Sequence, residues 1–416
     1  MAAVGRSEIS DSGNAVKKGS RSFAAFITGF DWLQIISLVF LLGVGLVFIH
    51  STGVQIGTPG AELFFQKQLT QWIPCGILLW LFFALTDYRK IHFKIGTVLF
   101  FVLTTLALLL VLKFGVKVYG ARRWLMLGSF RLQPSEFGKL SLILVLAWLY
   151  SNPRFSGAKW AGILAGGAIV MLPAILVFLE PDLGGTLILF PIAGAMLLVA
   201  GLKWRWLLAI AAAACIGFFT LRALVLADDP APPPRSTAST VARAPEKRGL
   251  LKPYQKKRLE TFFKPNSDIS NSGHNVYQSR LAVGAGGLKG KGIGNGTQNQ
   301  LGFLPQTVSN NDFIFSVIAE ETGFTGSLLL LAGYALLFCS CLRTALKAPP
   351  YGRMIAIGIT AMLFCHTYIN IGMCIGLAPV TGLPLPFVSY GGSFIFVGMI
   401  STGILQSVYR FSSTEK

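Results

Sequence analysis

The chain has 416 residues, of which 53% are hydrophobic and only 13% are charged, whereas a soluble domain carries about a quarter charged residues. Its hydrophobic residues fall in long blocks, which excludes a soluble globular protein and indicates several membrane crossings. The net charge of +19 suits anionic lipid or an anionic substrate, although membrane topology alone also requires basic residues. Neither nucleic-acid binding nor a disulfide framework is indicated, and the four histidines show no metal-ligand spacing.

The predicted elements begin after a polar segment, residues 1–29, which we interpret as a cytoplasmic tail. Ten apolar blocks follow, each of about 17–24 residues and therefore able to cross a hydrocarbon core of about 30 Å. They cover residues 32–50, 69–86, 93–113, 135–151, 160–178, 184–201, 205–224, 324–343, 354–377 and 389–409. We therefore predict an all-α, polytopic integral membrane protein with about ten transmembrane helices.

One long hydrophilic stretch divides these helices. Residues 225–312 separate helices 1–7, within 30–224, from a re-entering segment and helices 8–10, within 313–410. Residues 411–416 form a short C-terminal tail. Inside the long stretch, residues 228–247 are rich in Pro, Ala and Ser, which predicts a low-complexity insert without fixed structure. The predicted organisation thus has one large extracytoplasmic loop between helices 7 and 8.

Basic residues in the short loops predict the orientation. With both termini in the cytoplasm, the cytoplasmic loops hold Arg89, Lys90, Arg154, Lys159, Lys203, Arg205, Arg343, Lys347 and Arg353. One outer loop, KFGVKVYGARRWLMLGSFRLQPSEFGK, breaks this positive-inside pattern, because it puts Lys113, Lys117, Arg122, Arg123 and Arg131 outside. Topology does not require these charges, which favours a second purpose for them.

The centre of this outer basic loop has the composition of an anion site. Arg122 and Arg123 precede Trp124, and Lys117 lies five residues earlier. A guanidinium binds phosphate through paired hydrogen bonds, and an indole can stack on a sugar. The alternative is an aromatic belt at the membrane interface with snorkelling arginines. The broken charge pattern favours the anion site.

Acidic residues mark the end of the long hydrophilic stretch. Asp312 precedes the apolar run FIFSVIAEE, where a helix N-cap, a partly desolvated general base at the outer membrane face, or both roles together fit the pattern. Glu320 and Glu321 close the same run. For these two we expect a structural ion pair with a basic partner in preference to catalysis.

Two further motifs combine acids with turn residues or a lysine. QPSEFGK opens the predicted fourth helix and makes Glu136 and Lys139 neighbours three residues apart, which predicts a structural pair. EPDLGGT places Glu180 and Asp182 at the outer ends of the fifth and sixth helices. A turn explains the Pro and Gly residues there, but it does not explain the two acids.

Glycine-rich and proline-rich segments predict turns close to the membrane. GAGGLKGKGIGNGTQ fits neither phosphate-loop pattern and predicts tight turns. PVTGLPLPFVSYGGS, residues 379–393, is nearly uncharged and suits a re-entrant bend buried in protein. In the ninth helix, His366 and Asn370 are expected to make interhelical hydrogen bonds and not to ligate a metal.

Together these motifs resemble one family, the RodA/FtsW/SpoVE polytopic proteins, also called the SEDS family. The resemblance covers most of the chain outside the N-terminal tail and the insert, and its motifs follow the family's order within a ten-helix layout. The stretches YQKKRLETFFKP and GKGIGNGTQNQLGFLP are most similar to the RodA branch, with FtsW as the alternative. The other matching stretches are GARRWLMLGSFRLQPSEFGKLSL, EPDLGGTLIL, TVSNNDFIFSVIAEETG and INIGMCIGLAPVTGLPLPFVSYGGS.

The resemblance implies a peptidoglycan glycosyltransferase of the bacterial plasma membrane. Such enzymes polymerise lipid II on the outer face during cell elongation, with undecaprenyl pyrophosphate as the leaving group and a class B penicillin-binding protein as partner. The resemblance implies no certain cofactor; a divalent cation at the pyrophosphate is compatible with the chemistry, but the sequence offers no clear metal site. Two alternatives remain from the residues alone: a lipid flippase or transporter, and a scaffold for a transpeptidase.

The resemblance also carries roles to individual residues. Asp312 falls on the essential Asp of the family's TDFIF motif, and Trp124 falls on the Trp of its RRW stretch. We therefore predict Asp312 as catalytic and a substrate-binding role for Lys117, Arg122, Arg123, Trp124, Glu136, Lys139 and Asp182. Two departures from the family pattern are Gln306, where Glu is usual, and Asn311, where Thr is usual.

Overall fold

The computed structural model describes residues 29–53, 62–91, 94–118, 121–128, 130–227, 253–264 and 273–412. The described residues are mainly helical, with one small sheet. The predicted insert, 228–247, and nearly all of both predicted tails lie outside the described residues.

A helix lies at each of the ten predicted spans. Seven helical stretches among the described residues are long and apolar enough to cross a membrane. This confirms a multi-pass helical protein, whereas the number of ten spans stays a prediction. The helices are α2 (Trp32–Thr52), α3 (Glu62–Lys67) continuing through the π-helical turn η1 (Gln68–Trp72) into α4 (Ile73–Leu85), α6 (Lys94–Phe114), α7 (Pro134–Tyr150), α8 (Trp160–Leu179), α9 (Leu183–Val199), α10 (Trp204–Ala227), α15 (Ile314–Lys347), α16 (Pro350–Ile375) and α17 (Gly392–Ser412).

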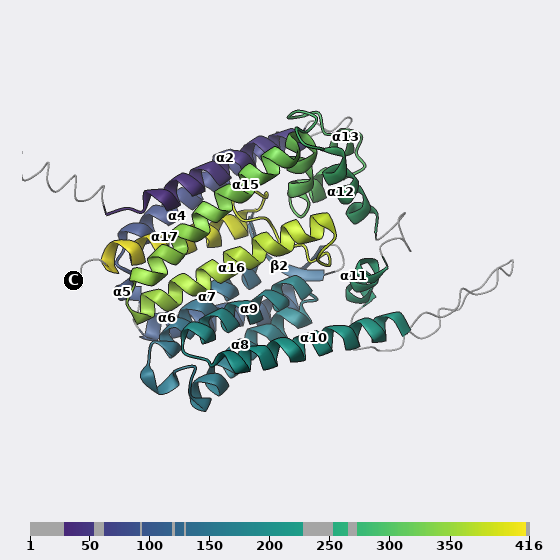
Figure 1. The fold of residues 1–416 in the computed structure, drawn as a ribbon. Helices are drawn as coiled ribbons and strands as arrows, with labels where there is room; N and C mark the ends of the chain where they lie inside the picture. Colours follow the sequence, from purple (N-terminus) through teal and green to yellow (C-terminus); the bar gives the residue numbers. More distant parts are fainter. Residues whose placement is uncertain are drawn as a thin grey trace, which may run out of the picture.

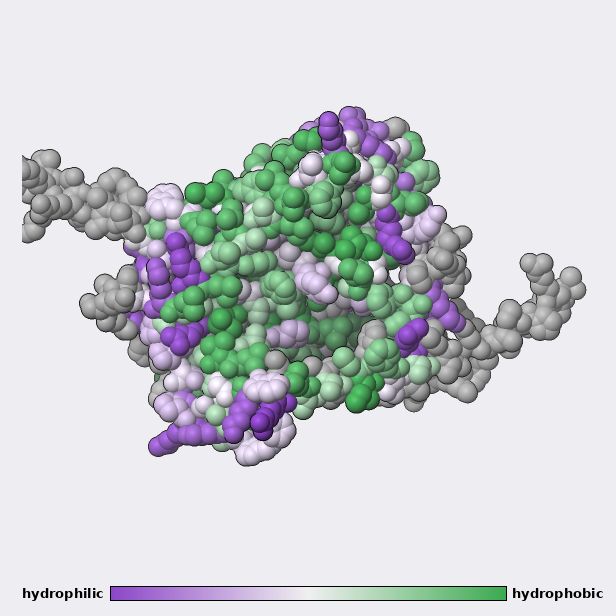
Figure 2. All heavy atoms as spheres, viewed as in Figure 1, coloured by the Kyte–Doolittle hydropathy of each residue, from purple (hydrophilic) through white to green (hydrophobic). Residues whose placement is uncertain are grey.

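The surface of the bundle is apolar where a soluble protein would be polar. Leu99, Leu103 and Leu110 of α6 are exposed, for example, as is Leu164 of α8. Figure 2 shows apolar residues across the middle of the molecule, with hydrophilic residues gathered toward its two ends. This distribution matches a hydrocarbon layer in contact with the middle of the bundle.

The centre of the bundle is formed by α7 and α17, in which most residues are buried. Helix α17 packs against α4, α16 packs against α7, α9 and α15, and α15 also packs against α2. Small residues allow the closest approaches, as is usual for membrane helices. At Gly45 of α2, an added Cβ would lie 2.8 Å from the carbonyl oxygens of Phe387 and Val388.

The outer basic loop contains a small antiparallel sheet, which the all-α prediction missed. Its strands are β1 (Val116–Val118), β2 (Ala121–Leu127) and β3 (Phe130–Leu132), in the order β1-β2-β3. Gly128, with φ +60°, lies in the turn between β2 and β3, a conformation that glycine reaches without strain. Short strands depend on pairing and turn geometry, so apolar periodicity alone did not reveal them.

Several short helices gather at one end of the molecule. Helices α11, α12 and α13 lie at the end opposite the beginning of α2 and the end of α17 (Figure 1). The first and last described helices therefore begin and end on the same side of the bundle. The bounds of the short helices are α5 (Tyr88–Ile91), η2 (Pro153–Phe155), α11 (Pro253–Phe263), α12 (His274–Ala285), α13 (Thr297–Gln300) and α14 (Gln306–Ser309).

Helix α15 is broken at Gly323, where φ is 68° and ψ is −161°. Residues with a side chain essentially never adopt this conformation. The part before the break is nearly all buried, and the part after it exposes Phe324, Leu328 and Leu329. The break therefore separates a buried first segment, which follows Asp312, from the membrane-exposed remainder.

Candidate active site

Asp312 lies in the turn between α14 and α15. Its backbone N–H donates to the Val308 carbonyl at 3.0 Å, but Phe313 occupies the N-cap position of α15 and no side chain caps that helix. The alternative that Asp312 is a helix N-cap is therefore wrong. Its half-buried carboxyl group is available for another role.

Charged residues from three separate elements surround the Asp312 carboxyl group. Arg258 of α11, Arg123 of β2 and Asp182 at the start of α9 all lie within electrostatic range. Burial raises the pKa of Asp312 above its ordinary value, and Asp182 raises it further, whereas the two arginines oppose this rise. Such opposing influences are typical of a carboxylate tuned for proton transfer.

Arg258 lies at the candidate site, although the sequence motifs did not single it out. Its Nη1 donates to the Val380 carbonyl at 3.0 Å. A Cβ added to Gly382 would lie 3.4 Å from Asp312 Oδ2 and 3.7 Å from Arg258 Nη1, so both charged groups border this glycine. The only signal for Arg258 was its place in the family-like stretch YQKKRLETFFKP, because 54 residues separate it from Asp312.

Arg123 and Asp182 form an ion pair beside this group. Arg123 Nη1 lies 3.5 Å from Asp182 Oδ1, and Arg123 Nη2 donates to the Pro181 carbonyl. Asp182 also caps α9 by accepting from the Gly185 N–H at 3.1 Å. Among the described residues, Arg123 Nε has no hydrogen-bond partner. Asp182 thus holds Arg123 in place and leaves one guanidinium N–H available.

The strand geometry of β2 separates the two neighbouring arginines. Successive strand residues point to opposite faces, and accordingly Arg122 is exposed while Arg123 is largely buried. Lys117 pairs with Arg122 across β1 and β2, and Trp124 is half-buried. The structure therefore brings Arg123, but not Arg122, to Asp312 and Asp182.

Glu136 and Lys139 face the interior of the bundle. Lys139 Nζ lies 2.8 Å from each Glu136 carboxylate oxygen and 2.9 Å from His366 Nε2. All three side chains are buried. The predicted structural pair is confirmed, as is the interhelical hydrogen bond expected for His366. Asp182 lies within electrostatic range of Glu136, so this pair borders the site from inside.

Glu180 is a buried acid next to the Arg123–Asp182 pair. Neither of its carboxylate oxygens has a hydrogen-bond partner among the described residues. Burial, reinforced by Asp182, raises the pKa of Glu180 to about 9, while Arg123 opposes this rise. Glu180 is consequently protonated at neutral pH. The described residues contain no group of three or more His, Cys, Asp or Glu side chains that could hold a metal ion.

Glu320 has the predicted basic partner, whereas Glu321 accepts hydrogen bonds from uncharged groups. Lys291 Nζ lies 2.6 Å from Glu320 Oε1, and Glu321 accepts from Ser51 Oγ at 2.6 Å and from the Gly294 N–H at 3.0 Å. The predicted tight turns are also confirmed, since four glycines in this segment have positive φ: Gly287, Gly290, Gly292 and Gly294.

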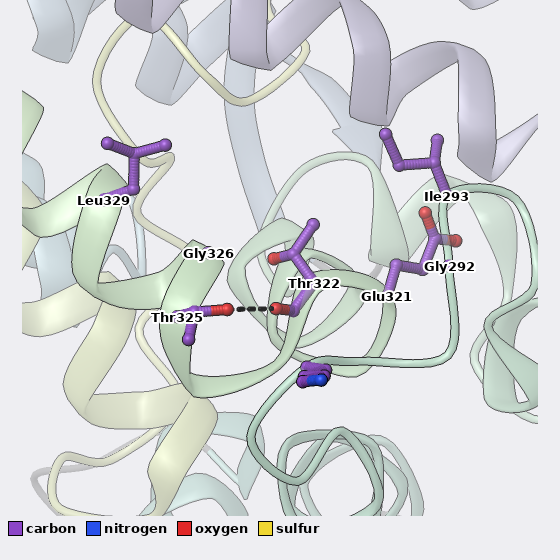
Figure 3. Close-up of a pocket in the computed structure, with 8 residues that line it drawn as sticks. Gly292, Ile293, Glu321, Thr322, Thr325, Gly326 and Leu329 are labelled. Atoms are coloured by element: carbon purple, nitrogen blue, oxygen red, sulfur yellow. Dashed lines mark hydrogen bonds between the residues drawn. The ribbon is translucent and has the colours of Figure 1, made fainter.

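A pocket of about 400 Å³ opens beside Glu321. Figure 3 shows Glu321 directed toward the segment of Gly292 and Ile293, with Thr322 and Thr325 further along the same helix, α15. Asp312 is not among the lining residues. The pocket is therefore separate from the charged group around Asp312.

Comparison with known proteins identifies the family of this chain. The FtsW/RodA/SpoVE model, described as a cell cycle protein, matches residues 31–414. The peptidoglycan glycosyltransferase RodA of Treponema pallidum is 32% identical over 92% of this chain and 98% of its own. The peptidoglycan glycosyltransferase MrdB of Escherichia coli (strain K12) is 37% identical over 74% of this chain and 76% of its own.

A solved structure has the same fold as this chain. Its subject is the structural coordination of polymerization and crosslinking by a peptidoglycan synthase complex. The aligned chains have a TM-score of 0.72 and 27% sequence identity, and the alignment covers 93% of this chain and 99% of the other. On these grounds the chain belongs to the FtsW/RodA/SpoVE family of cell cycle proteins.

Proposed function

We propose that this chain is a peptidoglycan glycosyltransferase of the bacterial plasma membrane, which polymerises lipid II during cell elongation. Its relatives with the names RodA and MrdB are peptidoglycan glycosyltransferases. The single observation that supports a particular active site is that the Asp312 carboxyl group lies close to two arginines from distant parts of the chain. Such a group supplies both a base and the positive charge that a diphosphate leaving group requires.

Asp312 acts as the general base. It accepts the proton of the acceptor GlcNAc 4-hydroxyl as that oxygen forms a bond to C1 of the donor MurNAc. The bond from C1 to the diphosphate oxygen breaks, and its electron pair leaves with undecaprenyl pyrophosphate. Direct displacement inverts C1, so an α-linked donor gives a β-1,4-linked product. Arg258 favours the ionised form of Asp312 in the resting enzyme.

Arg123 stabilises the departing diphosphate. Its Nε–H, which has no partner among the described residues, suits an oxygen of the leaving group. Asp182 and the Pro181 carbonyl orient the guanidinium for that purpose. Arg122, Lys117 and Trp124 are proposed to contact the lipid-linked substrate before it reaches Asp312. Glu136 and Lys139 are proposed to support the site from within the bundle.

We place both termini in the cytoplasm and the site on the outer face of the membrane. The positive-inside pattern supports this orientation. So does the arrangement of the bundle, because α2 begins and α17 ends opposite α11–α13 (Figure 1). The proposed partner is a class B penicillin-binding protein, which crosslinks the glycan. A synthase complex that coordinates polymerization and crosslinking contains the structurally similar chain.

Purified protein incubated with labelled lipid II tests this function directly. We expect glycan polymer from the parent protein and at least about 100-fold less from Asp312→Asn, with and without the partner. A flippase would move lipid II across a vesicle membrane without forming polymer. Absence of polymer from the folded parent protein together with its partner would contradict the proposed function.

A further inference from the structure

Three successive backbone carbonyls at Asp312 are each held from outside their own segment. The Asn310 carbonyl accepts from the Tyr390 N–H at 2.9 Å. The Asn311 carbonyl accepts from Ser389 Oγ at 2.6 Å, and the Asp312 carbonyl accepts from Asn370 Nδ2 at 2.9 Å. The donors belong to α16 and to residues 376–391, which follow it. We call these three hydrogen bonds the carbonyl clamp.

The clamp lies where the chain has no regular structure of its own. Residues 310–313 form turns between α14 and α15, so no helical ladder fixes the direction of the Asp312 side chain. Hydrogen bonds from a packed helix and a buried segment replace that ladder. The position of the proposed base is consequently set by residues that follow it by about 60 to 80 positions in the chain.

Asn370 is the central member of the clamp. It is fully buried in α16, and its amide group donates both to the Asp312 carbonyl and to the Leu383 carbonyl, at 2.8 Å. Ser389 makes a similar bridge, because its hydroxyl also accepts from the Leu385 N–H at 2.8 Å. Each side chain therefore ties the backbone at Asp312 to residues 376–391.

Residues 376–391 also position Arg258, the positively charged residue that faces Asp312. The Val380 carbonyl accepts from Arg258 Nη1, and Gly382 borders both the Asp312 carboxyl group and the Arg258 guanidinium. Gly382 has φ +76°, which brings the backbone close to the charged groups without a side chain. Residues 376–391 thus contact both the backbone at Asp312 and the guanidinium of Arg258.

From this geometry we infer that Asn370 and Ser389 are positioning residues for Asp312, acting through the backbone carbonyls of residues 311 and 312. The inference rests on the proposed function, in which Asp312 is the general base. Neither side chain needs to touch the substrate. Their effect is to hold the carboxyl group at a fixed distance from the attacking hydroxyl, and a displacement of about 1 Å can lower a rate by about 100-fold.

The test compares Asn370→Ala and Ser389→Ala with the parent protein in lipid II polymerisation. For both variants we expect kcat to fall by about 10-fold to 100-fold, while KM for lipid II changes far less. Ser389→Thr keeps the hydroxyl and should recover most of the rate. Thr367→Val is the matched control, because Thr367 is a buried residue of α16 whose hydroxyl, among the described residues, bonds only to the Leu363 carbonyl of the same helix.

A double variant separates positioning from general structural damage. In the Asp312→Asn background no base remains to be positioned, so Asn370→Ala should cause no further loss of the residual rate. Equal proportional losses in both backgrounds would overturn the inference, as would a Ser389→Ala variant with the parent's kcat. If Asn370→Ala does not fold, the pair of Ser389 variants still decides the outcome. Failure of the parent protein to polymerise lipid II would instead contradict the proposed function.

Discussion

Three acidic residues in the same short stretch have different surroundings. Glu320 and Glu321 each accept hydrogen bonds from a side chain and from backbone N–H groups of the glycine-rich segment. Among the described residues, no hydrogen bond to the Asp312 carboxylate is found. The charged residues that shift its pKa are Arg258, Arg123 and Asp182. A carboxylate whose hydrogen-bonding capacity is already used is poorly suited to accept a proton. Asp312 is the member of this group that retains that capacity.

The first prediction concerns Asp312→Asn, which preserves the shape of the side chain but removes the base. We expect polymerisation to fall by at least about 100-fold, within the range for a general base. Membrane insertion and the melting temperature should stay close to those of the parent, because the backbone clamp is unchanged. Labelled glycan products separated on a gel provide the measurement. Near-normal synthesis by this variant would sink the assignment.

The second prediction concerns Arg258→Ala. The arginine lowers the pKa of Asp312, so its removal should raise that pKa and favour the protonated carboxyl group. The acidic limb of the pH profile of kcat/KM should therefore move to higher pH, with a greater loss of activity at pH values of about 6 than at about 8. Arg258→Lys should restore the limb only in part, because a lysine lacks the guanidinium fork.

Arg122→Ala is the matched control for Arg258→Ala. Arg122 is an exposed arginine, next in the chain to Arg123 and on the opposite face of β2. We expect its removal to weaken lipid II use, mainly through KM, without moving the acidic limb. An equal shift of that limb in both variants would show that long-range charge, and not contact with Asp312, controls its pKa.

The third prediction concerns Glu180→Gln and the dependence of stability on pH. The pKa of Glu180 is about 9 in the folded protein, against an ordinary value of 4.5. Between these values the folded state binds more protons than the unfolded state, so the free energy of unfolding falls as pH rises. Glu180→Gln should remove this decline and gain a few degrees of melting temperature over the parent at high pH.

Thermal unfolding of the detergent-solubilised protein at two pH values, near 6 and near 8.5, measures this difference. The advantage of Glu180→Gln over the parent should be larger at the higher pH. A constant difference at both pH values would mean that Glu180 does not titrate in this window.

At the scale of elements, the break in α15 requires a residue without a side chain. Gly323 has φ 68° and ψ −161°, and an added Cβ would lie 2.4 Å from the Gly290 nitrogen and 2.7 Å from the Leu288 carbonyl carbon. The buried segment after Asp312 and the glycine-rich segment therefore meet backbone to backbone. The fourth prediction follows from this contact.

Gly323→Ala should destabilise the protein by about 1–3 kcal/mol from backbone strain alone, with a further cost from the steric contact. Gly284→Ala is the control, since Gly284 lies within α12 and an added Cβ there would meet no atom within 4 Å. The control should be neutral or slightly stabilising, because alanine favours a helix over glycine. Melting temperatures of the two variants decide the matter, and equal values would contradict the prediction.

The sequence was informative about helices and less informative about the sheet and the site. Helical hydrogen bonds are local, so each apolar block of about 20 residues could be recognised alone. The strands that contain Lys117 and Arg122 pair with each other, and no apolar periodicity revealed them. Arg258 and Asn370 were missed as site residues because their relation to Asp312 depends on packing between distant segments. The resemblance located Asp312, but it gave no partner for it.

At the scale of the whole molecule, the distribution of polar and apolar side chains is the reverse of that in a soluble protein. Apolar side chains cover the middle of the surface (Figure 2), while Glu136, Lys139 and His366 pair inside the bundle. Buried charges in a membrane protein are costly unless they are paired. Here their pairing joins α7 to α16, the helix that also carries Asn370. Helix α16 therefore contacts both the buried charges and the backbone of the proposed base.

The carbonyl clamp has a consequence for the order in which the protein is made. A ribosome produces Asp312 well before Asn370 and Ser389, and both partners lie within the last 50 residues of the chain. During that interval the carboxylate is already synthesised but has no fixed place. A nascent chain is therefore expected to use lipid-linked sugars slowly until the segment that contains Asn370 and Ser389 has been inserted.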